Sequence, residues 1–145
     1  MRINLGSGTD YREGWVNIEL SRKVKADHYL DVSKEPLPMT DSSVDYIEAI
    51  DLFEHILYPN FTFNECWRVL KPDGKLYLEV PYGGTIDYYK DPTHVRPFIP
   101  ITFNYYAEWN TSDAYEIRPW DILDLRSTTG GENENRIFVT MQPKK

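Results

Sequence analysis

The chain has 145 residues, of which 41% are hydrophobic and 14% aromatic, and its formal net charge is −7. This length predicts one domain, residues 1–145, with a single core, and the aromatic content excludes a disordered tail. The negative charge, without any cluster of Lys and Arg, argues against a nucleic-acid-binding protein and favours small-molecule or cationic partners.

The sequence carries no sign of secretion or of a membrane segment. Neither a signal peptide nor a long apolar span is visible, so we expect a cytoplasmic protein. Cys66 is the only cysteine, which rules out an internal disulfide framework. Its apolar neighbours predict a place in the core.

Short apolar or alternating runs predict seven strands. They cover residues 2–5, 15–20, 28–32, 44–50, 75–80, 115–125 and 136–141. Only eight residues separate Gly6 from Trp15, whereas a parallel crossover usually needs about a dozen or more. The first connection therefore has room for one helical turn at most. A parallel arrangement would leave one face of the sheet thinly covered.

Two helical segments lie between these strands. The apolar residues of 63–70 recur at helical spacing, and Pro72-Asp73-Gly74 then predicts a tight turn before the next strand. A second amphipathic stretch begins at Pro100 and ends near Asn110. The polar segment 127–135 predicts an antiparallel hairpin between the last two strands. Helices interleaved with strands favour an α/β fold.

The residues that follow the strands are the informative ones, because open parallel sheets bind ligands beyond the carboxyl ends of their strands. Glycines or acids follow the first four runs, at Gly6 and Gly8, Glu19, Asp31 and Asp51. Such carboxylates suit ribose hydroxyls, an exocyclic amine or a ligand ammonium. A nicotinamide cofactor is disfavoured, since the third glycine of its fingerprint is replaced by Tyr11.

Several blocks resemble the class I methyltransferases that use S-adenosylmethionine. They read "INLGSG", "GWVNIEL", "ADHYLDVSKEPLP", "SVDYIEAIDLFEHI", "ECWRVLKPDGKLYLEVP" and "DPTHVRPF". The similarity is greatest to small, type 11-like methyltransferases whose fourth-strand block ends in a Glu-His pair, and it runs from residue 2 to about residue 110. The resemblance implies a Rossmann-like, seven-stranded, mostly parallel sheet with an antiparallel C-terminal hairpin and minimal N-terminal cover.

The resemblance also implies a function and a first set of binding residues. We expect methyl transfer from S-adenosylmethionine to a small-molecule acceptor. The loop made of Leu5, Gly6, Ser7 and Gly8 would pass beneath the methionine part of the cofactor, and Glu19 would accept hydrogen bonds from both ribose hydroxyls. Without that cofactor, Gly6 and Gly8 are turn glycines and Glu19 is a solvated acid.

A second set of binding residues follows from the later strand ends. By the resemblance, Asp31 receives the adenine amine and Val32 packs on the ring, while Asp51 and Leu52 line the approach to the sulfonium. The residues themselves allow other interpretations. Asp31 can form an Asx-turn, and Asp51 with Glu54 has the spacing of a helix capping box.

Three residues are candidates for taking the acceptor proton: His55, His94 and Tyr82. Each histidine can equally be structural. The three histidines and one cysteine show no metal-ligand spacing, so we expect no metal. Glu79 puts a charge on a central strand, which is costly without a partner.

The main alternative is a non-catalytic protein that keeps the nucleoside pocket of this fold. The thin cover at the N-terminal side of the sheet, together with exposed aromatic residues, favours an open site, a covering partner or a homodimer.

Overall fold

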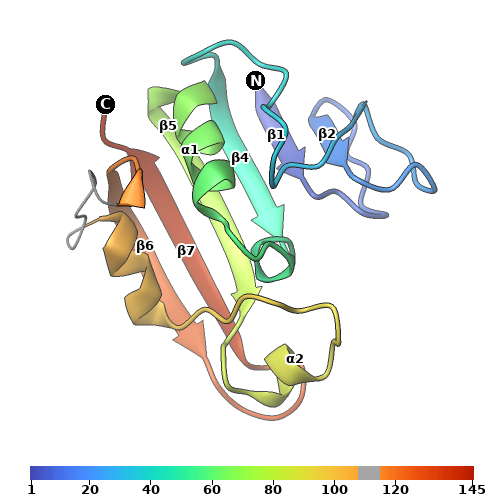
Figure 1. Cartoon of the computed structure of the whole chain (residues 1–145), viewed down its shortest axis with the longest axis vertical. Helices are drawn as coiled ribbons and strands as arrows, with labels where there is room; N and C mark the ends of the chain where they lie inside the picture. The colour runs from blue at the N-terminus through green and yellow to red at the C-terminus, as the bar shows by residue number, and fades with distance from the viewer. Residues whose placement is uncertain (108–114) are drawn as a thin grey trace.

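A computed structural model describes residues 1–107 and 115–145, and within them one seven-stranded sheet runs in the order β3-β2-β1-β4-β5-β7-β6 (Figure 1). The strands are β1 (Arg2–Leu5), β2 (Val16–Glu19), β3 (His28–Tyr29), β4 (Val44–Ile50), β5 (Leu70–Pro81), β6 (Trp120–Thr128) and β7 (Arg136–Pro143). The helices are the 3₁₀ helix η1 (Phe53–His55), α1 (Asn60–Val69), α2 (Ile86–Tyr89) and the 3₁₀ helix η2 (Pro100–Tyr106).

The pairing of the strands confirms the expected Rossmann-like sheet. Strands β1 to β5 pair in parallel with one another, whereas β7 is antiparallel to both β5 and β6. The chain moves outward from β1 through β2 to β3 and then returns to the other side of β1 with β4. The strand order therefore reverses between β1 and β4, where open α/β sheets bind their ligands.

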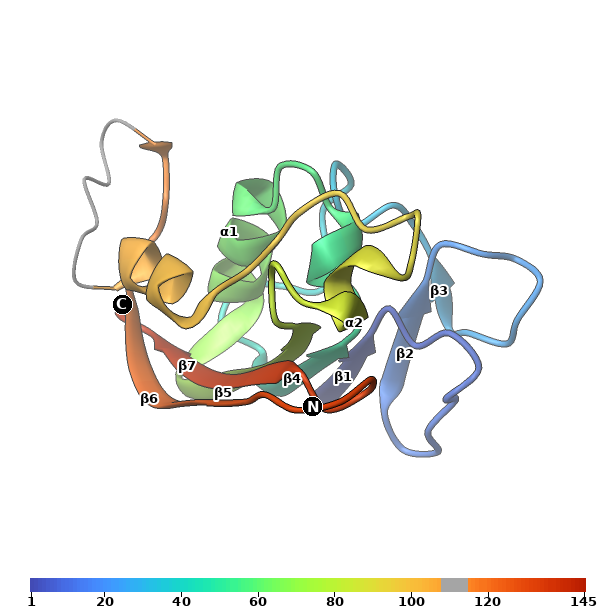
Figure 2. The same ribbon diagram turned by 90° about the horizontal axis from the view of Figure 1, so that it is seen from below.

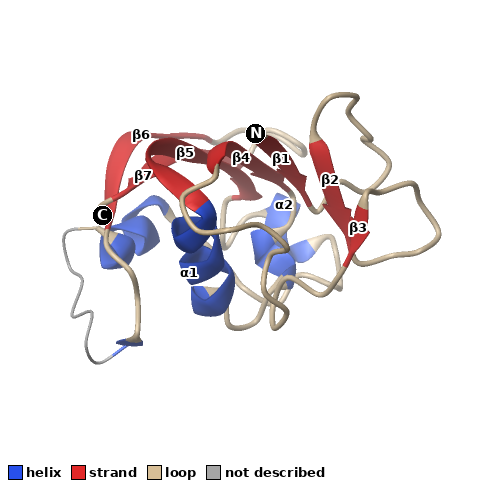
Figure 3. Ribbon diagram, turned by 90° about the horizontal axis from the view of Figure 1, so that it is seen from above, coloured by secondary structure: helices blue, strands red, loops and turns tan. Residues whose placement is uncertain are grey.

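The helices lie on one face of the sheet, as Figures 2 and 3 show. The connection from β1 to β2 contains no helix, in agreement with its short length. A parallel sheet normally carries helices on both faces. Here the described helices cover only one face, so the other is thinly covered.

Phe63 lies at the centre of the core beneath the covered face. Its ring centroid is 4.6 Å from that of Phe53 in η1, 4.0 Å from Tyr106 in η2 and 6.4 Å from Trp120 in β6. The expectation for Cys66 is confirmed, since it is fully buried on α1 and burial raises the pKa of its thiol. One helix thus joins residues from three other elements in a single core.

Several predicted boundaries are wrong in informative ways. Pro72-Asp73-Gly74 is part of β5, because α1 passes directly into that strand at Leu70. The register jumps there from Val44 opposite Leu70 to Tyr46 opposite Lys75, so the three residues lie in an irregular stretch within β5 and not in a turn ahead of the strand. A Cβ at Gly74 would lie 2.9 Å from the Val44 carbonyl oxygen, which explains the glycine.

Two strands are also displaced from their predicted ranges. β3 ends at Tyr29 because residues 31–35 form turns, and β6 starts at Trp120, five residues later than expected. The predicted end of the second helical stretch near Asn110 lies outside the described residues. Within those residues, no helix has the length and apolar character to cross a membrane.

Candidate functional site

The loop after β1, residues 5–8, packs closely against Leu52, which follows β4. Gly6 has φ +70° and Gly8 has φ +50°, and the N–H groups of Gly6 and Ser7 both donate to the Ile18 carbonyl. A Cβ at Gly6 would lie 2.9 Å from Leu52 Cδ1. The glycine therefore permits both the left-handed backbone and the close approach of the two strand ends.

The two other residues of this loop point into the protein. Leu5 is fully buried in the core, so only its backbone faces the loop. Ser7 is also buried, and its Oγ has no hydrogen-bond partner among the described residues. A buried hydroxyl without a partner is unusual and indicates a place where a ligand group or water binds.

Glu19 holds this loop from the end of β2. Its Oε2 accepts a hydrogen bond of 2.9 Å from the Gly8 N–H, and its Oε1 accepts one of 2.9 Å from the Ser21 N–H. Each carboxylate oxygen has a further lone pair. The carboxylate is thus fixed beside the glycine loop and can still accept hydrogen bonds from a ligand.

A cavity of about 240 Å³, the first cavity, opens at these strand ends. Its walls are mostly apolar and include two acids; the lining residues are Gly6, Ile18, Glu19, Leu20, Leu30, Asp31, Val32, Ser33, Leu52, His55 and Ile56. Five of the predicted cofactor residues are therefore brought together: Gly6, Glu19, Asp31, Val32 and Leu52.

Asp31 forms the Asx-turn that was one of its two interpretations. Its Oδ1 accepts from the Ser33 N–H at 3.1 Å and from the Ser33 hydroxyl at 2.6 Å, and its Oδ2 lies 3.0 Å from Lys34 Nζ. The bond from the Ser33 hydroxyl, together with Lys34, lowers the pKa of Asp31. It is an ionised turn residue that also lines the first cavity.

A larger cavity of about 610 Å³, the second cavity, lies beyond the ends of β4, β5 and β7. It is rich in charged groups; its lining comprises Asp51, His55, Glu79, Pro81, Asp87, Lys90, Asp91, His94, Thr128, Asn133, Glu134, Arg136 and Phe138. His55 lines both cavities, so the two meet at this side chain.

The two candidate histidines lie side by side at this junction, with ring centroids 4.8 Å apart. His94 Nδ1 is 2.7 Å from the Tyr88 carbonyl oxygen, and its side chain is 7% exposed. His55 Nδ1 is 3.1 Å from Thr93 Oγ1. Both imidazoles are therefore held through Nδ1.

Glu54 was expected only as part of a capping box, and that expectation is wrong. η1 has no side-chain cap, and Glu54 is fully buried. Burial, together with the charge of Asp51, raises the pKa of Glu54 to about 8. The main-chain oxygen of Glu54 accepts from the N–H groups of Val95 and Arg96, which holds the loop after His94 against η1.

Asp51 pairs with a residue that the sequence pattern did not single out. Its Oδ1 is 2.7 Å from an Arg136 guanidinium nitrogen, which is also 3.0 Å from Glu79 Oε1. Arg136 thus supplies the partner that Glu79 needs. These contacts link β4, β5 and β7 across long sequence separations, so no local spacing reveals them.

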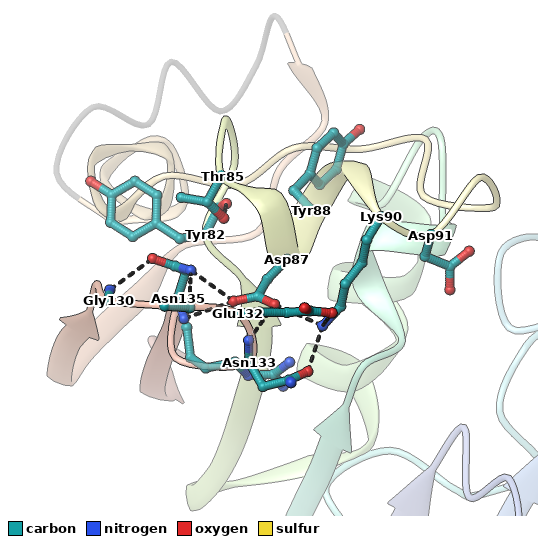
Figure 4. A network of polar contacts seen from close by, with 12 residues as sticks. Tyr82, Thr85, Asp87, Tyr88, Lys90, Asp91, Gly130, Glu132, Asn133 and Asn135 are labelled. Atoms are coloured by element: carbon teal, nitrogen blue, oxygen red, sulfur yellow. Dashed lines mark hydrogen bonds and ion pairs between the residues drawn. The ribbon is translucent and has the colours of Figure 1, made fainter.

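One wall of the second cavity is formed by a polar network around Asp87, which Figure 4 shows. Asp87 accepts hydrogen bonds from Lys90 Nζ at 2.7 Å, the Asn133 N–H at 2.7 Å and the Asn135 N–H at 2.9 Å. These bonds tie α2 to the β6–β7 hairpin. Tyr82 lines neither cavity, and Figure 4 shows its ring directed away from Lys90 and Asp91.

Comparisons with known proteins agree with this architecture. A family model described as a methyltransferase domain matches residues 7–78, about half of the chain. A S-adenosylmethionine-dependent methyltransferase from Archaeoglobus fulgidus is similar in structure, with TM-score 0.69 and 14% identity, over 97% of this chain and 85% of the other. A second from Aquifex aeolicus has TM-score 0.64 and 14% identity, over 98% and 81%.

The same fold also occurs in a protein with another described activity. The [4+2]-cyclase SpnF has TM-score 0.69 and 15% identity, over 98% of this chain and 74% of the cyclase. No curated protein sequence matches this chain. The family model agrees with the strand order 3-2-1-4-5-7-6 and with the glycine loop at the place where that order reverses. This chain belongs to the class I S-adenosylmethionine-dependent methyltransferase family.

Proposed function

We propose that this protein binds S-adenosylmethionine in the first cavity and transfers its methyl group to a small-molecule acceptor in the second cavity. The observation that carries the proposal is the meeting of the two cavities at His55. A donor and an acceptor placed on either side of one side chain have the proximity that a direct transfer requires.

The residues of the first cavity fit this cofactor. Apolar side chains such as Leu30 and Val32 suit the adenine ring, and Glu19 keeps free lone pairs for the ribose hydroxyls. The buried Ser7 hydroxyl, which has no hydrogen-bond partner among the described residues, can bind a polar group of the cofactor, and Gly6 lines the first cavity. We therefore assign Glu19 to the ribose and the loop from Leu5 to Gly8 to the methionine part.

On the acceptor side, the chain's own task is to orient a nucleophile and hold its proton. S-adenosylmethionine supplies, when bound, a methyl group on a positively charged sulfur. His55 is exposed and reaches both cavities, so we assign it as the group nearest the acceptor proton. His94 lies behind it and positions it by ring contact.

The charges of the second cavity favour a neutral or cationic acceptor that carries hydroxyl or amine groups. Its two fixed cations are already paired, Arg136 with Asp51 and Glu79, and Lys90 with Asp87. The lining includes two further acids, Asp91 and Glu134, and no further Lys or Arg. An anionic acceptor would meet repulsion there.

Calorimetric titration with S-adenosylmethionine, S-adenosylhomocysteine and NAD is the first test. We expect micromolar binding of the first two and none of NAD. A radiolabelled methyl group would then be followed into a panel of sugars, alcohols and amines. If the folded protein binds none of the three compounds, the first cavity is not a cofactor site and the proposal fails.

The alternative is a protein that binds the nucleoside without transferring methyl groups, and the similarity to a cyclase gives it weight. It predicts cofactor binding with no label in any product of the panel. Methyl transfer predicts one equivalent of S-adenosylhomocysteine for every labelled product.

A further inference from the structure

Three side chains with metal-binding groups converge where the two cavities meet. We propose that Glu54, His55 and His94 form a binding site for a divalent transition-metal ion. Their candidate ligand atoms all lie within 4.8 Å of one another. Sequence spacing did not predict the site, because η1 supplies Glu54 and His55 whereas His94 comes from the loop after α2.

Glu54 is the strongest evidence for a cation. It is fully buried, and neither carboxylate oxygen has a hydrogen-bond partner among the described residues. Buried carboxylates in proteins are normally paired or coordinate a metal. The nearest cationic candidate is His94, whose Nε2 is 3.8 Å from Glu54 Oε1, which is too long for a hydrogen bond. Two metal–ligand bonds of about 2.1 Å each can bridge such a gap.

The second nitrogen of each imidazole is held in the way that metal-binding histidines usually are. His94 Nδ1 faces the Tyr88 carbonyl oxygen at 2.7 Å, so this nitrogen carries the proton. His55 Nδ1 faces Thr93 Oγ1 at 3.1 Å, and that hydroxyl already donates to Asp91 at 2.6 Å. His55 Nδ1 must therefore donate too. In both neutral rings Nε2 keeps its lone pair for a metal.

The surroundings of His94 Nε2 also favour a cation. Besides Glu54, its neighbour is Asp91, with Oδ2 at 3.6 Å. The Asp91 carboxylate repels the Nε2 lone pair, and a cation bound between Nε2 and Glu54 offsets this repulsion. Backbone bonds from Val95 and Arg96 to the Glu54 oxygen hold the two elements in this arrangement.

The ligand set indicates which ions bind. Two imidazole nitrogens and one carboxylate suit Zn²⁺, Co²⁺, Fe²⁺ or Mn²⁺, whereas Mg²⁺ and Ca²⁺ prefer oxygen ligands. Three protein ligands leave a coordination position free, as in catalytic metal sites. His55 and His94 both line the second cavity, so the free position is open to an acceptor.

The role of the ion, though not its binding, rests on the proposed function. With the ion bound, His55 is a ligand and no longer takes the acceptor proton as it would in the metal-free site. An acceptor hydroxyl bound to the ion becomes more acidic and releases its proton to water. The acceptor oxygen then forms a bond to the methyl carbon, while the carbon–sulfur bond breaks with its electron pair remaining on sulfur. The products are a methyl ether and S-adenosylhomocysteine.

Titration of chelator-treated protein with Co²⁺, followed by visible absorption, tests the site directly. We expect one Co²⁺ per chain with the absorption bands of a nitrogen- and oxygen-ligated ion, displaced by Zn²⁺. His55→Ala and Glu54→Gln should each weaken binding by at least about 10-fold. The matched control is His28→Ala, because His28 is the one other histidine and lies exposed on β3.

His55→Ala is the decisive variant, since this exposed residue can be replaced without loss of the core. Absence of Co²⁺ and Zn²⁺ binding at millimolar concentration would overturn the site, as would equal binding by His55→Ala and His28→Ala. Binding of S-adenosylhomocysteine in the presence of chelator is measured in parallel. If it persists while metal binding is absent, the metal site fails and the proposed function stands.

Discussion

At the scale of single residues, Gly6 confirms the tight turn that the sequence predicts after the first strand, because this prediction depends only on the glycine itself. Its left-handed backbone and its contact with Leu52 both require the absence of a Cβ. The sequence could predict a tight turn there because glycine pairs after a strand have few other uses. It could not reveal Leu52 as the neighbour, since that contact depends on the placement of β4.

Gly6→Ala is expected to destabilise the protein by about 2–3 kcal/mol, from left-handed strain and the collision with Leu52. Gly14→Ala is the control, because Gly14 has φ +75° but open space around its Cα, and it should cost about 1 kcal/mol. Urea unfolding measures both. Equal losses in the two variants would show that the contact with Leu52 has no effect.

Glu19→Gln is expected to weaken S-adenosylhomocysteine binding by about 10- to 100-fold, because the charged acceptor beside the glycine loop is lost. Glu13→Gln provides the control, since Glu13 lies in the same part of the chain with a 90% exposed side chain. Calorimetry gives both affinities. Wild-type affinity in a folded Glu19→Gln variant would remove Glu19 from the binding site.

At the scale of elements, the sequence predicted most of the strands and the grouping of Gly6, Glu19 and Asp31 around one cavity. It failed where an element depends on a distant partner. The capping box at Asp51 and Glu54 is absent because Arg136 of β7 pairs with Asp51. Pro72-Asp73-Gly74 is an irregular stretch within β5 and not a turn ahead of the strand, because β4 pairs with residues on both sides of it.

The contact between α2 and the β6–β7 hairpin is expected to weaken in acid. Lys90, with hydrogen bonds from Asn133 and Asn135, holds the pKa of Asp87 well below its usual range. Since the folded-state pKa is the lower one, this stabilisation is complete above the unfolded pKa of about 4 and is lost as the pH falls below it.

Asp87→Asn should therefore reduce stability at about pH 7 and flatten its decline toward about pH 3. Urea unfolding across this range measures the effect, with Asp73→Asn as the control at an exposed position. A variant that keeps the full acid dependence of the wild type would rule out Asp87 as its source.

At the scale of the whole molecule, the core joins elements from the middle and the end of the chain. Phe63 touches rings from η1, η2 and β6. Its helical spacing predicted burial, whereas its three partners follow only from the topology. A homodimer through an exposed surface stays a prediction.

Phe63→Ala is expected to lower the free energy of unfolding by about 3–5 kcal/mol, because it leaves a cavity among these rings. Phe61→Ala changes the same residue type on the same helix where the side chain is 38% exposed, and should cost about 1 kcal/mol or less. Denaturant unfolding compares the two. Similar losses would show that α1 does not hold the core through Phe63.

The position of β7 between β5 and β6 has a consequence during synthesis. Of the seven strands it is the last to leave the ribosome, yet it pairs with the second half of β5 and with β6 from one end to the other. Until then, the nascent chain exposes the unpaired edges of two long strands, which can associate with other chains. A chain that ends shortly before Arg136 would thus keep the residues that line the first cavity but lack the strand that joins β5 to β6.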